Sequence, residues 1–84
     1  MIVKLDLLPN DKEVSLEIEI EGVSHINKME SDDVTLDFYN EDGCKYAMRQ
    51  LTEEGIPFNY SFGLVHICKA SFINIYAYDD KFKD

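Results

Sequence analysis

The sequence predicts an α+β domain in which a mostly antiparallel sheet of about five strands, in the order β-β-β-α-β-β, carries one helix packed on one face. Residues 13–21 read E-V-S-L-E-I-E-I-E, and this strict alternation of polar and apolar residues is typical of a half-buried strand. Residues 44–51 instead repeat their apolar side chains at helical spacing. A chain of 84 residues has the length of one domain, so we expect residues 1–84 to form a single acidic unit.

The first two strands are expected at residues 2–8 and 13–21. The earlier segment alternates loosely, and Pro9-Asn10-Asp11 between the two has the composition of a turn. This arrangement predicts an antiparallel hairpin. Gly22 then interrupts the alternation, which resumes in another phase over residues 23–26. We interpret Gly22 as a bulge or bend that curls one long strand.

Residues 34–39 alternate again and predict a third strand with one apolar face. Two interpretations stay open for residues 44–54. The preferred one is a helix, with Asp42 as a cap at its start and Gly55 at its end, because the apolar residues recur three and four positions apart. The alternative is a hairpin through the turn sequence N-E-D-G, followed by a strand.

The last third of the chain is rich in β-branched and aromatic residues. Residues 58–63 are expected to be irregular, whereas residues 64–69 and 72–78 predict a closing hairpin that turns near Ala70-Ser71. The charged residues 79–84 are expected to form a frayed tail.

The charge balance is the most unusual property of the composition. Seventeen acidic residues against eight basic ones give a formal charge of −9. Such a field repels nucleic acids and anionic membranes, whose binding proteins carry clustered Lys and Arg, and it attracts basic surfaces. The alternative interpretation is that the acidic residues only keep a small protein soluble.

The segments that direct a protein to a membrane or out of the cell have no counterpart in this sequence. Lys4 and Asp6 interrupt the apolar run that a secretory leader would need. No apolar run approaches the roughly 18 residues of a membrane span. Cys44 and Cys68 are most simply free thiols in a reducing compartment. We therefore expect a cytoplasmic protein that does not bind membranes.

Motifs that carry catalysis or bind cofactors do not appear in this sequence. The four glycines are isolated, so there is no phosphate-binding loop, and no cysteine or histidine stands in a nucleophile signature. His25, Cys44, His66 and Cys68 form a conceivable zinc set, but they come from four different predicted elements. We expect neither an enzyme nor a cofactor, and we keep a metal-dependent regulator only as a third hypothesis.

The acidic row of the 13–21 strand is the candidate functional feature. Its successive carboxylates would be spaced about 6.6 Å apart, twice the strand rise, and no cation interrupts them. If the 34–39 strand pairs beside this strand, Asp33 and Asp37 would lie on the same side. The predicted partner-binding residues are Glu13, Glu17, Glu19, Glu21, Asp33 and Asp37.

These features favour a non-catalytic binding protein that occupies the basic site of a nucleic-acid-handling enzyme. In size, acidity and lack of motifs the chain resembles phage-encoded inhibitors of host defence, anti-CRISPR proteins among them, and the immunity proteins of nuclease toxins. The resemblance lies in bulk properties and assigns no role to any residue. The alternative is an assembly module, in which strands ending with Phe72–Tyr78 pair edge to edge into a homodimer.

Overall fold

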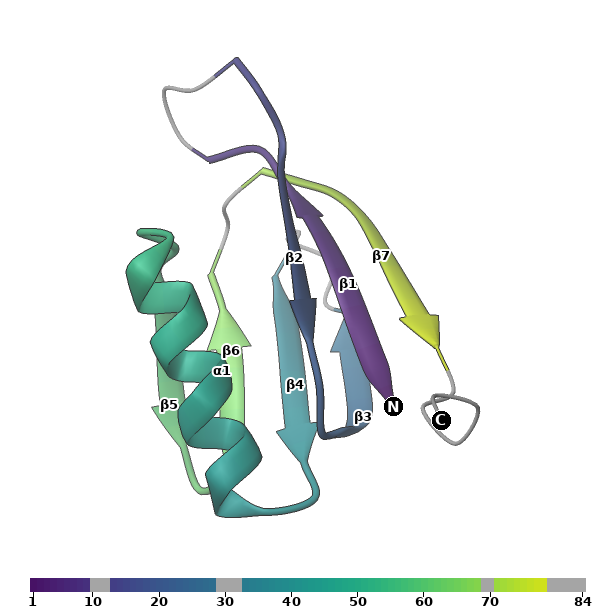
Figure 1. The fold of residues 1–84 in the computed structure, drawn as a ribbon, viewed down its shortest axis with the longest axis vertical. Coiled ribbons are helices and arrows are strands. Elements are labelled where there is room, and N and C mark those ends of the chain that lie inside the picture. The colour runs from purple at the N-terminus through teal and green to yellow at the C-terminus, as the bar shows by residue number, and fades with distance from the viewer. Residues whose placement is uncertain (10–12, 29–32, 69–70, 79–84) are drawn as a thin grey trace.

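The computed structural model describes residues 1–9, 13–28, 33–68 and 71–78 and shows an α+β fold (Figure 1). Seven strands and one helix make up the described part of the chain, against the five strands expected. In chain order they are β1 (Ile2–Leu7), β2 (Leu16–Ile20), β3 (Val23–Lys28), β4 (Val34–Phe38), α1 (Glu41–Glu53), β5 (Phe58–Ser61), β6 (Leu64–Ile67) and β7 (Phe72–Tyr78).

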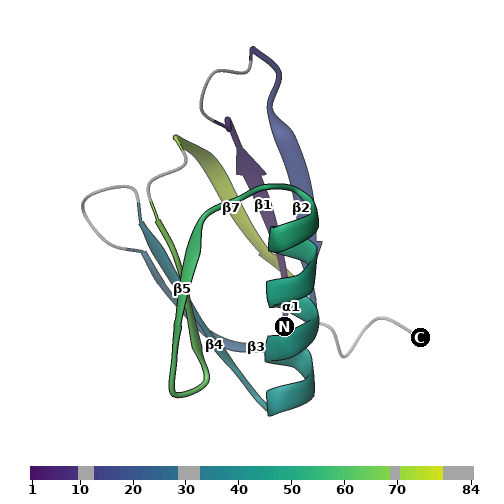
Figure 2. The ribbon, with the colours of Figure 1, turned by 90° about the vertical axis from the view of Figure 1, so that its left-hand side faces the viewer.

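The strands form two antiparallel sheets. A three-stranded sheet has the order β2-β1-β7, and a four-stranded sheet has the order β3-β4-β6-β5. The predicted pairing of the first two strands is confirmed, since β1 and β2 are antiparallel neighbours; residues 10–12 of the expected turn lie outside the described residues. Both the three-stranded sheet and α1 lie on the same side of the four-stranded sheet (Figures 1 and 2).

The core fills the space between the four-stranded sheet and these two covering elements. Each strand that borders it contributes alternate residues, as the period of a strand requires, and α1 contributes one stripe of small and apolar side chains. The fully enclosed side chains include Val3, Leu5, Leu7, Ile20, Val23, Val34, Leu36, Cys44, Ala47, Leu51, Val65 and Ile67. Burial of each valine, leucine and isoleucine among them contributes roughly 1.5 to 3 kcal/mol, so this layer is the main source of stability.

The predicted helix is confirmed, and its ends follow standard capping chemistry. Asn40, rather than Asp42, caps the start: its backbone is extended and its side chain accepts a hydrogen bond from the Gly43 N–H at 2.9 Å. At the other end the Ile56 N–H donates to the Leu51 carbonyl at 2.9 Å, and Gly55 has a φ of +73°. This is the pairing of a Schellman motif, which needs a left-handed residue at the position of Gly55.

The expected bend at Gly22 is a crossing between the two sheets rather than a bulge in one long strand. β2 ends at Ile20 in the three-stranded sheet, and β3 begins at Val23 in the four-stranded sheet. Gly22 has a φ of +82°, and its carbonyl accepts a hydrogen bond from the Tyr39 N–H at 3.1 Å. The positive φ lets the chain turn out of one sheet within two residues.

The predicted closing hairpin is wrong. The strand at Leu64–Ile67 pairs with β4 and β5, whereas the strand at Phe72–Tyr78 pairs with β1 in the other sheet. Residues 58–63, expected to be irregular, supply the hairpin partner instead, through β5 and a two-residue turn. The turn was predicted near Ala70-Ser71, and residues 69–70 lie outside the described residues.

The expected strand at residues 13–21 is shorter than its pattern suggests. β2 begins only at Leu16, and Val14 is 76% exposed. The alternating pattern of residues 13–15 therefore lies before the paired part of the strand, because the ladder with β1 ends at the Leu7–Leu16 pair.

Replacement of Phe62 by Asn is expected to stabilise the β5–β6 hairpin. Phe62 has a φ of +49°, is followed by Gly63 at +81°, and is 98% exposed. A left-handed conformation costs a bulky residue about 1 kcal/mol, whereas Asn-Gly suits a turn with two positive φ angles. The free energy of unfolding in urea should rise by about this amount in Phe62→Asn. Phe62→Ala, which keeps the strained backbone, is the control and should show no comparable gain.

Candidate functional site

β2 presents two carboxylates on the outer face of the three-stranded sheet. Glu17 and Glu19 are exposed, and they alternate with Ile18 and Ile20, which are buried beneath the sheet. In the adjacent strand Asp6 lies directly opposite Glu17. Like charges in directly opposed positions repel one another, so this face concentrates negative charge at a local cost in stability.

The sequence had suggested that no cation accompanies the acidic row, but the structure places one beside it. Lys4 of β1 lies opposite Glu19 and forms an ion pair with the carboxylate of Glu17. Its ammonium group also lies 5.9 Å from the centre of the Tyr76 ring. The sequence could not show this because the lysine comes from a neighbouring strand. The hydrogen bond to Glu17, with further attraction from nearby negative groups, raises the pKa of Lys4 above its ordinary value of 10.5.

The other predicted residues do not join a single surface. Glu13 is exposed before the start of β2, and Glu21 is exposed immediately after its end. Asp37 lies on β4 of the four-stranded sheet, and Asp33 immediately precedes that strand. The condition that the 34–39 strand pairs beside the 13–21 strand is therefore not met. β4 lies between β3 and β6, and β2 has only β1 as a partner within the described strands.

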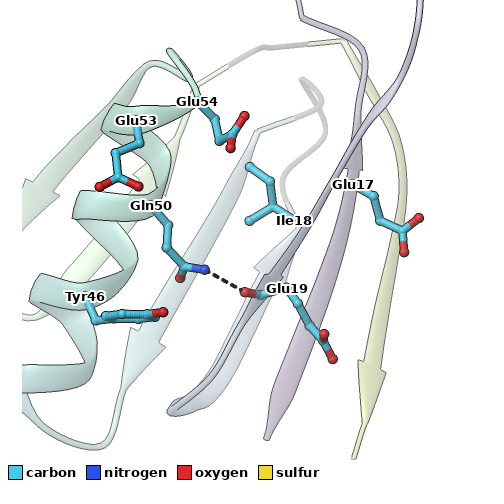
Figure 3. A pocket seen from close by; sticks show the side chains of 7 residues that line it. All are labelled: Glu17, Ile18, Glu19, Tyr46, Gln50, Glu53 and Glu54. Atoms are coloured by element: carbon cyan, nitrogen blue, oxygen red, sulfur yellow. Dashed lines mark hydrogen bonds between the residues drawn. The ribbon is translucent and has the colours of Figure 1, made fainter.

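A groove of about 300 Å³ runs between β2 and α1 (Figure 3). It forms because β2 is an edge strand whose outer margin faces the helix. The Gln50 side chain crosses this gap and donates a hydrogen bond to the Glu19 backbone carbonyl at 3.0 Å. The lining residues are Glu17, Ile18, Glu19, Tyr46, Gln50, Glu53 and Glu54.

The chemistry of the groove is that of a site for cations. Four of its lining residues are glutamates, and neither lysine nor arginine is among them. The Oε1 atom of Gln50 is buried and makes no hydrogen bond with the described residues. A planar cation with several N–H donors would match carboxylate acceptors of this kind.

The sequence analysis missed the helical half of this groove. Tyr46, Gln50, Glu53 and Glu54 lie beside the buried stripe of α1, and their spacing of three and four residues places them along one side of the helix. That spacing could have identified a shared polar face. It could not have shown that β2 lies opposite, because the contact depends on how two distant segments pack.

The histidines and cysteines do not gather into the metal set considered from the sequence. Cys44 is buried on α1, whereas His66 lies on the outer face of the four-stranded sheet. His66 is held there by Asp33, at 3.2 Å from Nε2, and by Thr35, at 3.1 Å from Nδ1. Cys68 accepts a hydrogen bond from the Asn59 side chain at 3.0 Å. Among the described residues no group of three or more potential ligands is placed to hold a metal ion.

Comparison with known proteins leaves this site to be interpreted from its own chemistry. No family model, no curated protein and no solved structure matches the chain. Within the described ranges, no helix has the length and apolar character to cross a membrane.

The Lys4–Glu17 pair is expected to stabilise the fold only while the lysine is charged. Because the pKa of Lys4 is raised by folding, the pair's contribution is fully present below about pH 10.5 and is lost as the pH rises through the folded-state pKa. The difference in urea midpoint between the wild type and Lys4→Met should therefore be constant at neutral pH and shrink in strong alkali. A difference that grows with pH would contradict the assignment.

The two thiols are expected to differ sharply in reactivity. Burial, and secondarily the charge of Glu41, raises the pKa of the Cys44 thiol above its ordinary value of 9.0, and the side chain is 1% exposed. Cys68 is only partly buried. Because the thiolate is the reactive form, a thiol reagent should modify one cysteine quickly in the native protein and the second only after unfolding. The Cys68→Ser variant should lose the fast phase and keep the slow one.

Proposed function

We propose that this protein is a non-catalytic binding protein whose acidic groove between β2 and α1 receives lysine or arginine side chains from a basic protein surface. The observation that carries the proposal is the lining of the groove, which includes four glutamates from two separate segments of the chain and neither lysine nor arginine. Clustered carboxylates from unrelated segments repel one another. A cationic partner would relieve this repulsion on binding.

Arginine suits the groove better than lysine does. Its guanidinium group has five N–H donors in a fixed plane and can bind two acceptors at once. Glu19 of β2 and Glu54, which caps the C-terminal end of α1, both line the groove, and so does the ring of Tyr46. Glu17 would have to exchange its contact with Lys4 for a contact with the partner, so Glu19, Glu53 and Glu54 carry most of the proposed interaction.

The proposed partner is an enzyme that handles nucleic acid, and the protein would inhibit it by occupying its basic site. Such enzymes concentrate lysine and arginine where they hold phosphates. A net charge of −9 would speed the encounter with such a surface and would repel nucleic acid itself. This is the mode expected of an inhibitor of a defence nuclease or of a nuclease immunity protein. Glu13, before β2, and Glu21, after it, would add to the long-range field, whereas Asp33 and Asp37 lie at β4 of the other sheet and are left out of the contact.

Charge reversal in the groove tests the proposal. The double variant Glu19→Lys/Glu53→Lys should lose binding to an arginine-rich peptide and to a partner captured from a lysate of the source cell. The control is Glu13→Lys/Glu41→Lys, which changes the net charge equally but alters exposed residues outside the groove. The control should retain most of the affinity. Loss of one good charge-assisted contact corresponds to roughly a tenfold weaker affinity.

Two further measurements distinguish the groove from a general effect of acidity. Titration with the arginine peptide should shift the nuclear magnetic resonance signals of the Gln50 side-chain amide and leave those of Asn59 unchanged. Duplex DNA or RNA should compete with the protein for the captured partner. Equal loss of binding in both double variants would mean that the acidic residues serve only solubility and overall charge.

A further inference from the structure

Among the described strands, β7 leaves one long edge of the three-stranded sheet open. It pairs with β1 on one side, and no described strand pairs with it on the other. Its seven residues, F-I-N-I-Y-A-Y, contain no charge, no proline and no glycine. Soluble proteins usually protect such edges with charges, prolines, bulges or short strands, because an open edge is a template for pairing with another chain.

The other sheet edges carry protection of this kind. The edge of β2 faces α1, where the Gln50 side chain donates a hydrogen bond to the Glu19 carbonyl. β5 is only four residues long. β3 has an irregular register near its start and ends in Lys28. β7 is thus the exception among the described strands.

The register shows which backbone groups point outward from β7. The Glu19 carbonyl points away from β1 and toward Gln50, so the opposed pair Lys4–Glu19 is one that does not exchange hydrogen bonds. The backbone groups of Lys4 must then point to β7 and its partner Tyr76, since the direction alternates along an antiparallel ladder. The N–H and C=O groups of Ile75 and Ala77 consequently point to the open edge.

The side chains of this strand add apolar surface at the same edge. Ile73, Tyr76 and Tyr78 are 55%, 42% and 45% exposed. Within the described residues, the Ile75 N–H donates to the side-chain Oδ1 of the neighbouring Asn74 at 2.9 Å. This local contact between adjacent residues can be exchanged for a hydrogen bond to an incoming strand.

We propose that the open edge of β7 binds a second copy of this chain. The two strands pair antiparallel about a two-fold axis and join the three-stranded sheets into one six-stranded sheet. Ile75 of each copy exchanges backbone hydrogen bonds with Ala77 of the other, which uses the groups that point outward. In this register the Tyr76 rings of the two copies lie directly opposite, as a cross-strand aromatic pair.

A second copy fits this edge better than a basic partner does, because β7 itself is uncharged. The acidic strand β2 lies at the far margin of the sheet, about 10 Å away at the usual strand spacing. Two chains of charge −9 still repel each other at long range, and salt screens that repulsion. The dimer should therefore tighten as salt rises, whereas binding of a basic surface in the groove should weaken.

Mass measurement by light scattering and sedimentation tests the dimer over a wide concentration range at low and high salt. The wild type should approach twice the mass of one chain at high concentration. Ala77→Pro removes an outward N–H without breaking the β1 ladder and should be monomeric, whereas Ala77→Ser, which keeps that N–H, should dimerise. A wild type that is monomeric throughout, a dimer that dissociates as salt rises, or a dimer that persists in folded Ala77→Pro would overturn the proposal.

Disulfide trapping gives a second test that does not depend on the proline variant. Directly opposed residues in a pair without hydrogen bonds have Cα atoms about 4.5 Å apart, within the range of about 4.4 to 6.8 Å for a disulfide. In a Cys68→Ser background, Tyr76→Cys should form a covalent dimer rapidly under mild oxidation. Tyr60→Cys, at a site of matching 43% exposure on the other sheet, should not. Equal rates would overturn the proposed pairing. The groove proposal is unaffected by either result, because its variants lie at the opposite edge and are read out by binding of a basic partner.

Discussion

The constraint on which the rest of this structure depends is the need to cover one apolar face of the four-stranded sheet. Val34 and Leu36 of β4, with Val65 and Ile67 of β6, have no exposed surface, so two layers of structure must enclose them. In a chain of this size no single element is wide enough to do so. The three-stranded sheet covers one half of the face and α1 covers the other (Figures 1 and 2).

Two covers side by side must meet along a seam, and the candidate binding site lies there. β2 is the strand of the three-stranded sheet that lies nearest to α1. Its margin would expose unpaired backbone groups if the helix did not approach it. Gln50 satisfies one of these groups directly. The seam is shallow and open to water, so its other positions carry polar side chains, and in this chain most of them are carboxylates. The groove is a consequence of the covering arrangement, and its charge is a property of the sequence.

The opposite margin of the same sheet has no such neighbour. β7 lies on the side of the molecule away from α1 (Figure 1). Its edge therefore stays open within the described structure. The two proposed surfaces thus sit at the two margins of one three-stranded sheet, one acidic and one uncharged. In the proposed homodimer the two acidic grooves would lie at the outer ends of the joined sheet, away from the paired β7 strands.

Lys4 pairs with only part of the acidic face of the three-stranded sheet. Lys4 lies in β1, the central strand of the three-stranded sheet, where it contacts Glu17 on one side and Tyr76 on the other. It neutralises the inner part of the acidic face and leaves the helix side of the groove without a cation. On the far sheet, Asp33 is engaged with His66.

The sequence by itself determined the local elements, since periodicity records which side of each segment is buried. Alternation placed the strands of the first hairpin and the strand at residues 34–39, and the helical spacing placed α1 within a few residues. It also placed Glu17 and Glu19 on an outward face. Only the tertiary structure decided the strand partners. Leu64–Ile67 and Phe72–Tyr78 are equally apolar, and nothing local shows that one joins β4 and the other β1. The same holds for Lys4 beside Glu17 and for Glu54 across from Glu19, because such contacts arise from burial of distant segments against one another.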